Sequence, residues 1–555
     1  MKVLLVMPHL TRGPRNNTPG DCWYVPAYGV MYISSYLKQN GFDVETLNLN
    51  HYTNEKLDTV LRQQRFDAVC TGGLFTYMRE FEEILRLAKH YHRHVKTILG
   101  GPVTTAHPSF AMQALNPDFL VIGEGELTTA ELLTAIANND AIDTVCGIGY
   151  SSNGRFIQTP LRPPIEDLNT LPFPDYEGFE FEYYLEHFPK RSIDNASYLN
   201  PNIRSGGIIG GRDCPGKCTF CFRITGGKLR VRSVENVISE VRYLIDTYGV
   251  NDIAMMDDVF AIKKSRIYEF CDAIKPLNIS WTCQLRVPGV DEDLLMAMKE
   301  AGCYLVSYGF ESASPKVLKS MKKGITVKQI ENVIAPTRKV KLTLQANFIF
   351  GDPAESLDTA KETLAFARKY KWLHLGLNFI KPFPGSDLYH DLVTKGAIKN
   401  LNHFWVNSAY DEDGRLINMT GLNDEEMRRL RAMVYVERMH KNYFSIDRIS
   451  KTADGQYLVT VICPICGRTS ENLKIPKPGL LACPQCYMRA FLDSVDFSDM
   501  TPTQKRACKL GRQFLIMAAK RILDHDVWGM HAIRAYHRYK GQNQSMNFSK
   551  LHLKI

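Results

Sequence analysis

Three cysteines lie close together near the middle of the chain. Cys214, Cys218 and Cys221 give the spacing C-x3-C-x2-C directly after a predicted buried strand. Three thiolates at this spacing can hold three corners of an iron–sulfur cube, whose usual complement is four cysteines. No fourth cysteine lies nearby in the sequence, so one iron would stay open to an outside ligand. Structural zinc sites are closed by four ligands, which disfavours zinc at this position.

A second group of cysteines has a different spacing. Cys463, Cys466, Cys483 and Cys486 give C-x2-C-x16-C-x2-C. Two C-x2-C knuckles with such a gap predict a closed tetrahedral zinc site, a zinc ribbon over about residues 458–490. The alternative is an auxiliary iron–sulfur cluster, but the Cys-Pro-x-Cys knuckles favour zinc. We expect this metal to stabilise a small module that lacks a core of its own.

Length and composition predict a large globular protein of several domains. The chain has 555 residues, of which 45% are hydrophobic and 23% charged, with a net charge of only +9. No apolar run reaches the length of a membrane helix. Pro8 interrupts the N-terminal apolar stretch, so we expect no secretory signal and a cytoplasmic location. Clustered thiols in such a chain favour metal ligation over disulfides.

Short apolar strands alternate with helix-length segments over residues 1–150, which predicts an α/β domain with a parallel sheet. Ligands of such sheets lie beyond the carboxyl ends of the strands. The predicted ends are rich in glycine, which permits close approach to a bulky ligand, although simple turns would also explain it. The G-x-G-x-x-G motif is absent, which disfavours a dinucleotide. The candidate residues are Gly72, Gly73, Gly100, Gly101, Gly123, Glu124 and Gly125.

The remaining chain divides into three parts. Residues 151–200 are rich in proline and predict a linker or wrapping segment. Residues 201–400 contain six further strand–helix units, which predict a partial (β/α)6 barrel with its chemistry at the carboxyl ends of the strands. Residues 401–555 predict a charged helix, the zinc ribbon and a basic amphipathic helix over 502–523. We do not expect this basic tail to bind nucleic acid, because no recognised motif accompanies it.

The cysteine segment resembles the signature of the radical S-adenosylmethionine enzymes, which includes an aromatic residue at the position of Phe220. In that family a [4Fe-4S] cluster binds S-adenosylmethionine through its open iron, and reductive cleavage yields a 5′-deoxyadenosyl radical. The resemblance also implies an electron donor such as a flavodoxin or ferredoxin. Other strand ends are similar to the family's S-adenosylmethionine contacts, although each residue could instead be structural: Asp257, Asp258, Arg286, Glu311 and Ser312.

Members of this family with an N-terminal parallel-sheet domain usually bind cobalamin there. The segments 26–30, 97–102 and 121–126 resemble that domain, which implies that the glycine-rich strand ends contact cobalamin. The motif D-x-H-x-x-G, which supplies a histidine to cobalt in other cobalamin proteins, is absent, and His9 does not fit it. The lower face of cobalt would then be held by water, another residue or nothing.

Together these features predict a cobalamin-dependent radical S-adenosylmethionine enzyme that methylates carbon on a small-molecule or peptide substrate. An unactivated sp³ carbon has no lone pair to attack a methyl donor, whereas a carbon radical can take a methyl group from methylcobalamin. One alternative is an oxidative cyclase, or another redox rearrangement enzyme, of the same family. An alternative of another class is a non-catalytic protein that senses redox state or binds metal.

Overall fold

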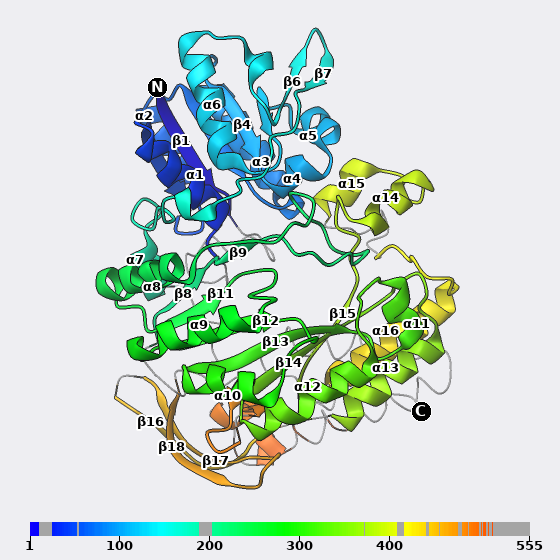
Figure 1. Cartoon of the computed structure of the whole chain (residues 1–555). Helices are drawn as coiled ribbons and strands as arrows, with labels where there is room; N and C mark the ends of the chain where they lie inside the picture. Colours follow the sequence, from blue (N-terminus) through cyan, green and yellow to red (C-terminus); the bar gives the residue numbers. More distant parts are fainter. Residues whose placement is uncertain are drawn as a thin grey trace.

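The computed structural model describes residues 1–9, 25–52, 55–187, 203–370, 372–407, 416–439, 443–453, 455–475, 480–486, 488–498, 501, 503–506, 509 and 513. Within these ranges the chain forms a first α/β domain, a second α/β domain and a small C-terminal module (Figure 1). Most of the helix expected over 502–523 lies outside the described residues. Among the helices that the structure describes, none is long and apolar enough to cross a membrane.

The first domain is built on a seven-stranded sheet in the order β2-β1-β3-β4-β5-β6-β7. Its first five strands run parallel, as predicted, and β6 and β7 add an antiparallel hairpin that extends the sheet past residue 150. The strands are β1 (Lys2–Met7), β2 (Asp43–Asn48), β3 (Ala68–Gly72), β4 (Lys96–Gly100), β5 (Phe119–Val121), β6 (Ile148–Ser152) and β7 (Arg155–Gln158). The helices are α1 (Tyr28–Gln39), α2 (Glu55–Gln63), α3 (Met78–Tyr91), α4 (Pro102–Ala106), α5 (Pro108–Leu115) and α6 (Gly125–Asn138).

Strand β1 shows why this sheet is covered on both faces. Val3, Leu5 and Met7 belong to the main hydrophobic core, whereas Leu4 and Val6 belong to a separate core on the opposite face. All five side chains are at most 2% exposed. Successive side chains of a strand point to opposite faces, so a continuous apolar run requires helices on both sides.

The second domain contains six parallel strands whose spatial order follows the chain, β15-β14-β13-β12-β11-β8. The sheet therefore stays open, with β8 and β15 at its two edges, and the predicted partial barrel is confirmed. Its strands are β8 (Ser205–Ile208), β11 (Asp252–Met255), β12 (Ser280–Leu285), β13 (Cys303–Glu311), β14 (Thr343–Phe350) and β15 (His374–Phe379). The main helices are α8 (Val234–Tyr248), α9 (Lys264–Ile274), α10 (Glu292–Glu300), α11 (Pro315–Ser320), α12 (Val327–Lys339) and α13 (Leu357–Lys369).

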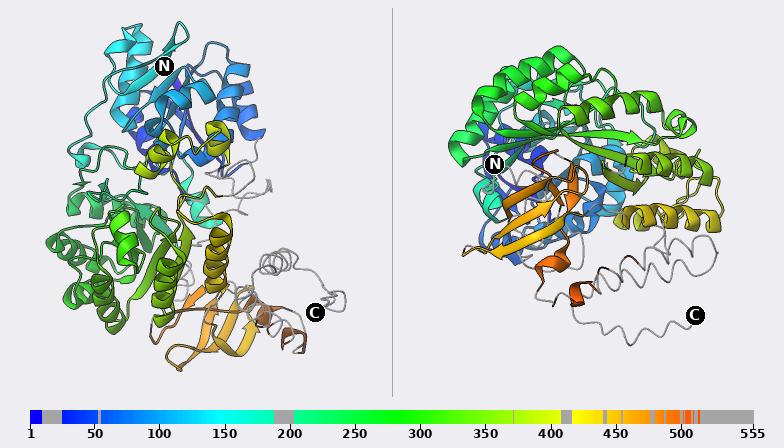
Figure 2. Two further views of the ribbon diagram at one scale, coloured as in Figure 1. Left: turned by 90° about the vertical axis from the view of Figure 1, so that its right-hand side faces the viewer. Right: turned by 90° about the horizontal axis from the view of Figure 1, so that it is seen from below.

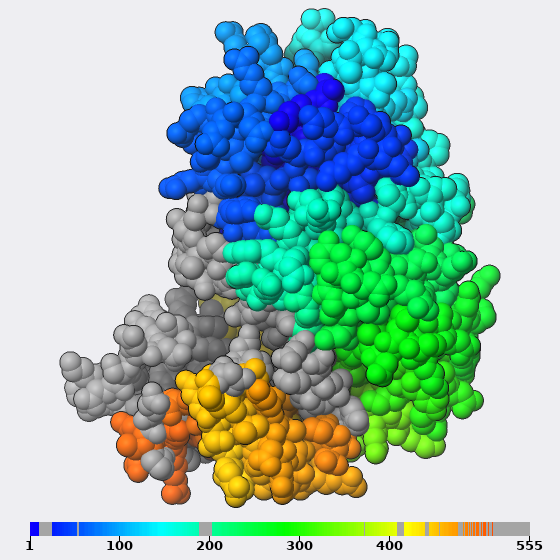
Figure 3. Space-filling model, turned by 90° about the vertical axis from the view of Figure 1, so that its left-hand side faces the viewer, coloured from blue at the N-terminus to red at the C-terminus, as the bar shows by residue number. Residues whose placement is uncertain are grey.

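Residues 159–187 wrap across the junction of the two domains and end in helix α7 (Phe181–His187) (Figure 3). Asp175 accepts a hydrogen bond from Ser34 of α1 at 2.6 Å, and the Tyr176 hydroxyl donates to Glu240 of α8 at 2.6 Å. Six apolar side chains of this segment are buried in the main core: Leu168, Leu171, Tyr176, Phe179, Phe181 and Leu185. The proline-rich segment thus contributes to the packing of both domains.

The chain after the barrel returns to the first domain. Helices α14 (Asp387–Thr394) and α15 (Leu401–Val406) lie beside it, as two views show (Figures 1 and 2). The fully buried Trp405 ring packs against Phe75 and Phe110, with ring centroids 5.9 and 4.9 Å apart. Further on, α16 (Asp424–Met439) runs along α13 and confirms the predicted charged helix.

The C-terminal module is a three-stranded antiparallel sheet with an adjoining two-stranded ribbon. The sheet consists of β16 (Ser445–Lys451), β17 (Tyr457–Ile462) and β18 (Thr469–Ile475), and the ribbon of β19 (Leu480–Ala482) and β20 (Arg489–Phe491). It has a small apolar core that includes Val459, Val461 and Ile475. In Figure 1 it lies at the end of the molecule opposite the first domain.

The packing of α15 gives a first testable prediction. Trp405→Ala should destabilise the protein by about 3–5 kcal/mol, because it removes a large buried side chain from the interface with the first domain. Trp372→Ala is the control, since that ring is only partly buried and lies under Arg338. Thermal unfolding followed by calorimetry would measure both. Equal midpoints for the two variants would show that α15 does not hold the first domain.

Candidate active site

The carboxyl ends of the barrel strands face the first domain, and the cysteine segment lies at this junction (Figure 1). A two-stranded ribbon, β9 (Gly211–Arg212) and β10 (Arg230–Val231), encloses residues 213–229, which we call the cysteine loop. Within it Cys218 is buried, Cys214 is half-buried and Cys221 is exposed. The loop thus presents three thiols on a segment whose two ends are paired to each other.

Phe220 anchors the cysteine loop to the barrel. Its ring packs on an apolar cluster formed by Val317, Met321, Ile380 and Leu388. The backbone supports this contact, because Thr219 donates to the Met321 carbonyl and accepts from the Leu388 amide, both at 3.1 Å. The aromatic residue of the motif therefore contributes by packing, which holds the neighbouring cysteines in place.

Two cations lie beside the thiols. A Cβ added to Gly216 would lie 3.2 Å from Cys214 Sγ, 3.8 Å from Cys218 Sγ and 3.3 Å from Arg286 Nη1, so these three atoms converge on one point. A hydrogen bond from Cys221, together with the nearby Lys323 and Arg286 charges, lowers the pKa of Cys218 to about 6 despite burial. The thiolate is the form that binds metal. The donor set therefore fits an iron–sulfur cluster.

Asp257, which lies two residues after the end of β11, has two carboxylate oxygens with different surroundings. Its Oδ1 accepts hydrogen bonds from the amides of Gly210 and Gly211 at 2.6 and 2.8 Å. Its Oδ2 is buried and has no hydrogen-bond partner among the described residues. Burial raises the pKa of Asp257 to about 7. Buried polar atoms are almost always satisfied, so this oxygen fits a donor on a bound ligand, such as an ammonium or hydroxyl group.

The other predicted contacts of S-adenosylmethionine differ in what they offer. Asp258 is exposed, and partial desolvation and the like charge of Asp213 raise its pKa. Glu311 has a positive φ of 62° and pairs with Lys323 at 2.8 Å. The buried Ser312 hydroxyl lies 3.0 Å from Thr363 Oγ1 and accepts from the Ser314 amide. Ser312 is therefore engaged within the fold, whereas Asp258 is free to face a ligand.

The glycines of the first domain divide into two groups. A Cβ on Gly72 would lie 2.7 Å from the Gly100 oxygen, and one on Gly101 would lie 2.8 Å from the Gly73 nitrogen. These glycines let the loops after β3 and β4 pack against each other, and a Cβ on Gly125 would similarly meet Ile33. Gly123 differs, because its φ is +86° and no described atom lies within 4 Å of an added Cβ.

An open position of this kind lets a bulky ligand approach the backbone, which is compatible with a cofactor such as cobalamin. The neighbouring Glu124 carboxylate is already engaged by protein groups. It accepts from Arg212 at 2.8 Å, from Arg230 at 2.8 Å and from the Ile165 amide at 2.7 Å.

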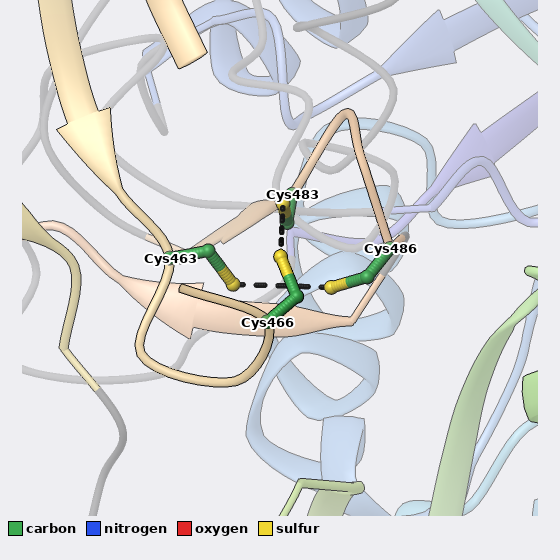
Figure 4. A group of neighbouring side chains, drawn as sticks. All are labelled: Cys463, Cys466, Cys483 and Cys486. Carbon is green, nitrogen blue, oxygen red and sulfur yellow. Dashed lines mark hydrogen bonds between the residues drawn. The ribbon is translucent and has the colours of Figure 1, made fainter. Parts of the chain in front are cut away.

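The four C-terminal cysteines converge on one point (Figure 4). Their sulfur atoms all lie within 4.8 Å of one another, and the pairs Cys463–Cys486 and Cys466–Cys483 are each 3.8 Å apart. Hydrogen bonds from Cys483 and Cys486 lower the pKa of Cys463. Four sulfurs around one point fit a single tetrahedral ion, whereas a cluster of several irons would hold its cysteines further apart.

Sequence reasoning named Glu124 as a candidate but did not predict that it joins the two domains, and it missed its partners. Arg212 and Arg230 flank the cysteine loop, and the carboxylates that they bind, Glu124 and Glu126, follow β5. Lys323, which lies beside the thiols, was missed as well. The sequence signal that could have found these residues is that opposite charges follow predicted strand ends in the two domains. Which charges pair depends on how the two sheets face each other.

Two parts of this chain match models of known protein families. The B12 binding domain model matches residues 23–133, and the Radical SAM superfamily model matches residues 208–367. The chain is 28% identical to an uncharacterized methyltransferase of Pyrococcus horikoshii, over 79% of this chain and 92% of that protein. It is also 28% identical to the anaerobic magnesium-protoporphyrin IX monomethyl ester cyclase of Rubrivivax gelatinosus, over 73% of this chain and 72% of that one.

The fold is similar to a solved structure of the radical S-adenosylmethionine methyltransferase TsrM from Kitasatospora setae with cobalamin and a [4Fe-4S] cluster bound. The TM-score is 0.62 at 17% identity, over 79% of this chain and 88% of that one. The first match falls on the seven-stranded domain, and the second begins at the end of β8 and covers the cysteine loop and the barrel as far as α13. The chain therefore contains a match to the B12 binding domain followed by a match to the Radical SAM superfamily, in the same order as the two α/β domains of the structure.

Proposed function

We propose that this protein is a cobalamin-dependent radical S-adenosylmethionine enzyme that transfers a methyl group to an unactivated carbon. The observation that carries the proposal is the junction itself. The cysteine loop carries three thiols, and Arg212, which directly precedes it, contacts Glu124 of the first domain beside Gly123. Such a junction would bring a methyl carrier and a radical-generating site to one substrate, and proximity of this kind is a large part of catalysis.

Each part of the site has a proposed role. Cys214, Cys218 and Cys221 would hold the [4Fe-4S] cluster, with one iron left for S-adenosylmethionine. Asp257 would accept the ammonium group of S-adenosylmethionine through its unpartnered oxygen, and Arg286 would pair with the carboxylate. When bound, the cluster supplies the electron that cleaves the sulfonium, and cobalamin carries the methyl group. The protein residues bind, orient and exclude water.

The remaining proposals concern partners and the C-terminal module. An external donor such as a flavodoxin or ferredoxin would supply the electron, and the substrate would be a small molecule or peptide. Zinc at the four C-terminal cysteines would stabilise the module and take no part in the reaction. Oxidative cyclisation is a second candidate, because the similarity to the cyclase spans 73% of this chain. Product mass separates the two, since methylation adds a methyl group and cyclisation removes hydrogens.

Loss of any thiol of the cysteine loop should abolish cluster assembly. Alanine at Cys214, Cys218 or Cys221 leaves too few protein ligands for the cube. We expect less than one tenth of the wild-type iron after anaerobic reconstitution, and no release of 5′-deoxyadenosine from S-adenosylmethionine. Cys271→Ala is the control, because that thiol is buried in helix α9, away from the loop. A variant with full iron content and normal release would contradict the assignment.

The raised pKa of Asp257 predicts a pH-dependent affinity for S-adenosylmethionine. Binding an ammonium group requires the ionised carboxylate, whose pKa in the free protein is about 7. Below pH 7 a proton must leave on binding, so the dissociation constant should rise by up to about tenfold per pH unit as the pH falls. Above pH 7 the affinity should level off.

The measurement is equilibrium binding to the cluster-loaded protein between pH 5.5 and 8.5. Asp257→Asn should bind more weakly at pH 8 and lose the slope. Glu355→Gln is the matched control, since burial also raises the pKa of Glu355 to about 7 but its carboxylate accepts from Thr359 and Gly351. An unchanged slope in Asp257→Asn would rule out this role for Asp257.

The C-terminal module should depend on its metal. Cys463→Ser should remove about one equivalent of zinc per chain, because a structural zinc site needs all four ligands. Metal analysis would measure the loss, and limited proteolysis should then cleave within 445–498 while the barrel stays intact. Cys70→Ala, at a buried thiol of β3, is the control. Iron in place of zinc at full occupancy would favour an auxiliary cluster instead.

A further inference from the structure

The two domains are joined by a buried set of charges that we call the inter-domain clamp: Glu124, Glu126, Arg212, Asp213 and Arg230. Arg212 donates to Glu124 at 2.8 Å and to Glu126 at 2.6 Å. Arg230 donates to Glu124 at 2.8 Å and to Asp213 at 3.1 Å. Glu124 is thus the one carboxylate of the clamp that both arginines share.

Burial makes these contacts selective. The side chains of Arg230, Glu126, Asp213 and Glu124 are between 3% and 8% exposed, and that of Arg212 is 18% exposed. Burial opposes ionisation of Glu124, but Arg230 and Arg212 outweigh it and hold its pKa below the usual range. Burial likewise opposes the charge of Arg212, but Glu126 and Glu124 hold its pKa above the usual range. A buried charge is costly without a partner. The loop after β5 and the cysteine loop therefore each need the other in position.

The clamp reaches both predicted cofactor sites through the chain. Glu124 directly follows Gly123, the open position at the end of β5. Asp213 directly precedes Cys214 and has a positive φ of 68°, a conformation that ordinary residues rarely adopt. The Asp213 carboxylate also accepts a hydrogen bond from the Thr225 hydroxyl across the cysteine loop. A residue of the clamp is therefore the immediate chain neighbour of a residue in each predicted site.

We propose that Glu124 is a positioning residue that couples cobalamin binding at the first domain to the arrangement of the cysteine loop. This inference rests on the proposed function, since it assumes that both cofactors bind. A ligand bound beside Gly123 restrains Glu124 in its contacts with both arginines, and Arg230 in turn holds Asp213, which precedes Cys214. Coupling between two sites is reciprocal, so a cluster in the cysteine loop must also strengthen cobalamin binding.

The test compares cobalamin affinity with and without the cluster. Hydroxocobalamin binding is measured by anaerobic equilibrium dialysis on full-length protein, cluster-free and then reconstituted. In the wild type we expect about tenfold tighter binding with the cluster, a typical size for coupling between sites. Cobalamin should also slow the release of cluster iron to a chelator by a similar factor.

In Glu124→Gln, the cluster should no longer change the affinity for cobalamin, and cobalamin should no longer change the rate of iron release. Both ratios should be close to one. This variant leaves Arg212 paired with Glu126 and Arg230 paired with Asp213, two cations against two carboxylates, so its fold should persist. Glu126→Gln makes the same change in charge but keeps the shared carboxylate, and it should retain the coupling. Glu166→Gln is a second control. The Glu166–Lys228 pair joins the segment 159–187 to the cysteine loop, but both side chains are about 70% exposed.

The outcomes are distinct. If wild-type protein binds cobalamin with the same affinity with and without the cluster, the coupling is overturned and the proposed function stays intact. Wild-type protein that binds no cobalamin would overturn both. Full coupling in Glu124→Gln would overturn the role of Glu124. If Glu124→Gln takes up no iron, Arg230→Lys is tested instead. A single ammonium group cannot bridge Glu124 and Asp213 as the guanidinium does, so the coupling should be lost. Coupling of wild-type size in Arg230→Lys would overturn the proposal.

Discussion

The arrangement of this molecule depends on charges that are buried between its two α/β domains. Arg212 and Arg230 flank the cysteine loop of the barrel and form ion pairs with carboxylates of the first domain. Arg232 and Tyr176 both bond to the fully buried Glu240 of α8, and Arg232 also donates to the Tyr32 hydroxyl of α1 in the first domain. A buried charge without a partner is costly, so these contacts allow few relative positions of the domains. The carboxyl ends of both sheets are held face to face as a result.

Parallel strands explain why that arrangement produces a site. Every loop after a parallel strand lies at the same edge of its sheet, and both sheets turn this edge toward the junction (Figure 1). The cysteine loop, Asp257 and Arg286 follow β8, β11 and β12, while Gly123 follows β5. Residues that are far apart in the sequence therefore lie close together, because each of them follows a strand that ends at this junction.

The fold and the grouping of the cysteines could be predicted from local patterns. Apolar runs with helices between them predicted both parallel sheets, and cysteine spacing predicted the two groups of thiols, of which the C-terminal four converge in the structure. The glycines were harder to interpret. Gly72 and Gly101 are required where two loops pack together, whereas Gly123 faces open space, and a sequence pattern cannot separate these two reasons. Likewise, Ser312 bonds to Thr363, which lies 51 residues away.

The sequence by itself determined the order of the domains, the strands that build them and the two sets of cysteines, because periodicity and spacing are local properties of the chain. Only the tertiary structure decided which charged residues pair across the domains, that α15 returns to the first domain, and that Asp257 keeps one oxygen unpartnered among the described residues. These outcomes depend on burial and on contacts between distant segments, which exist only once the two sheets have packed against each other.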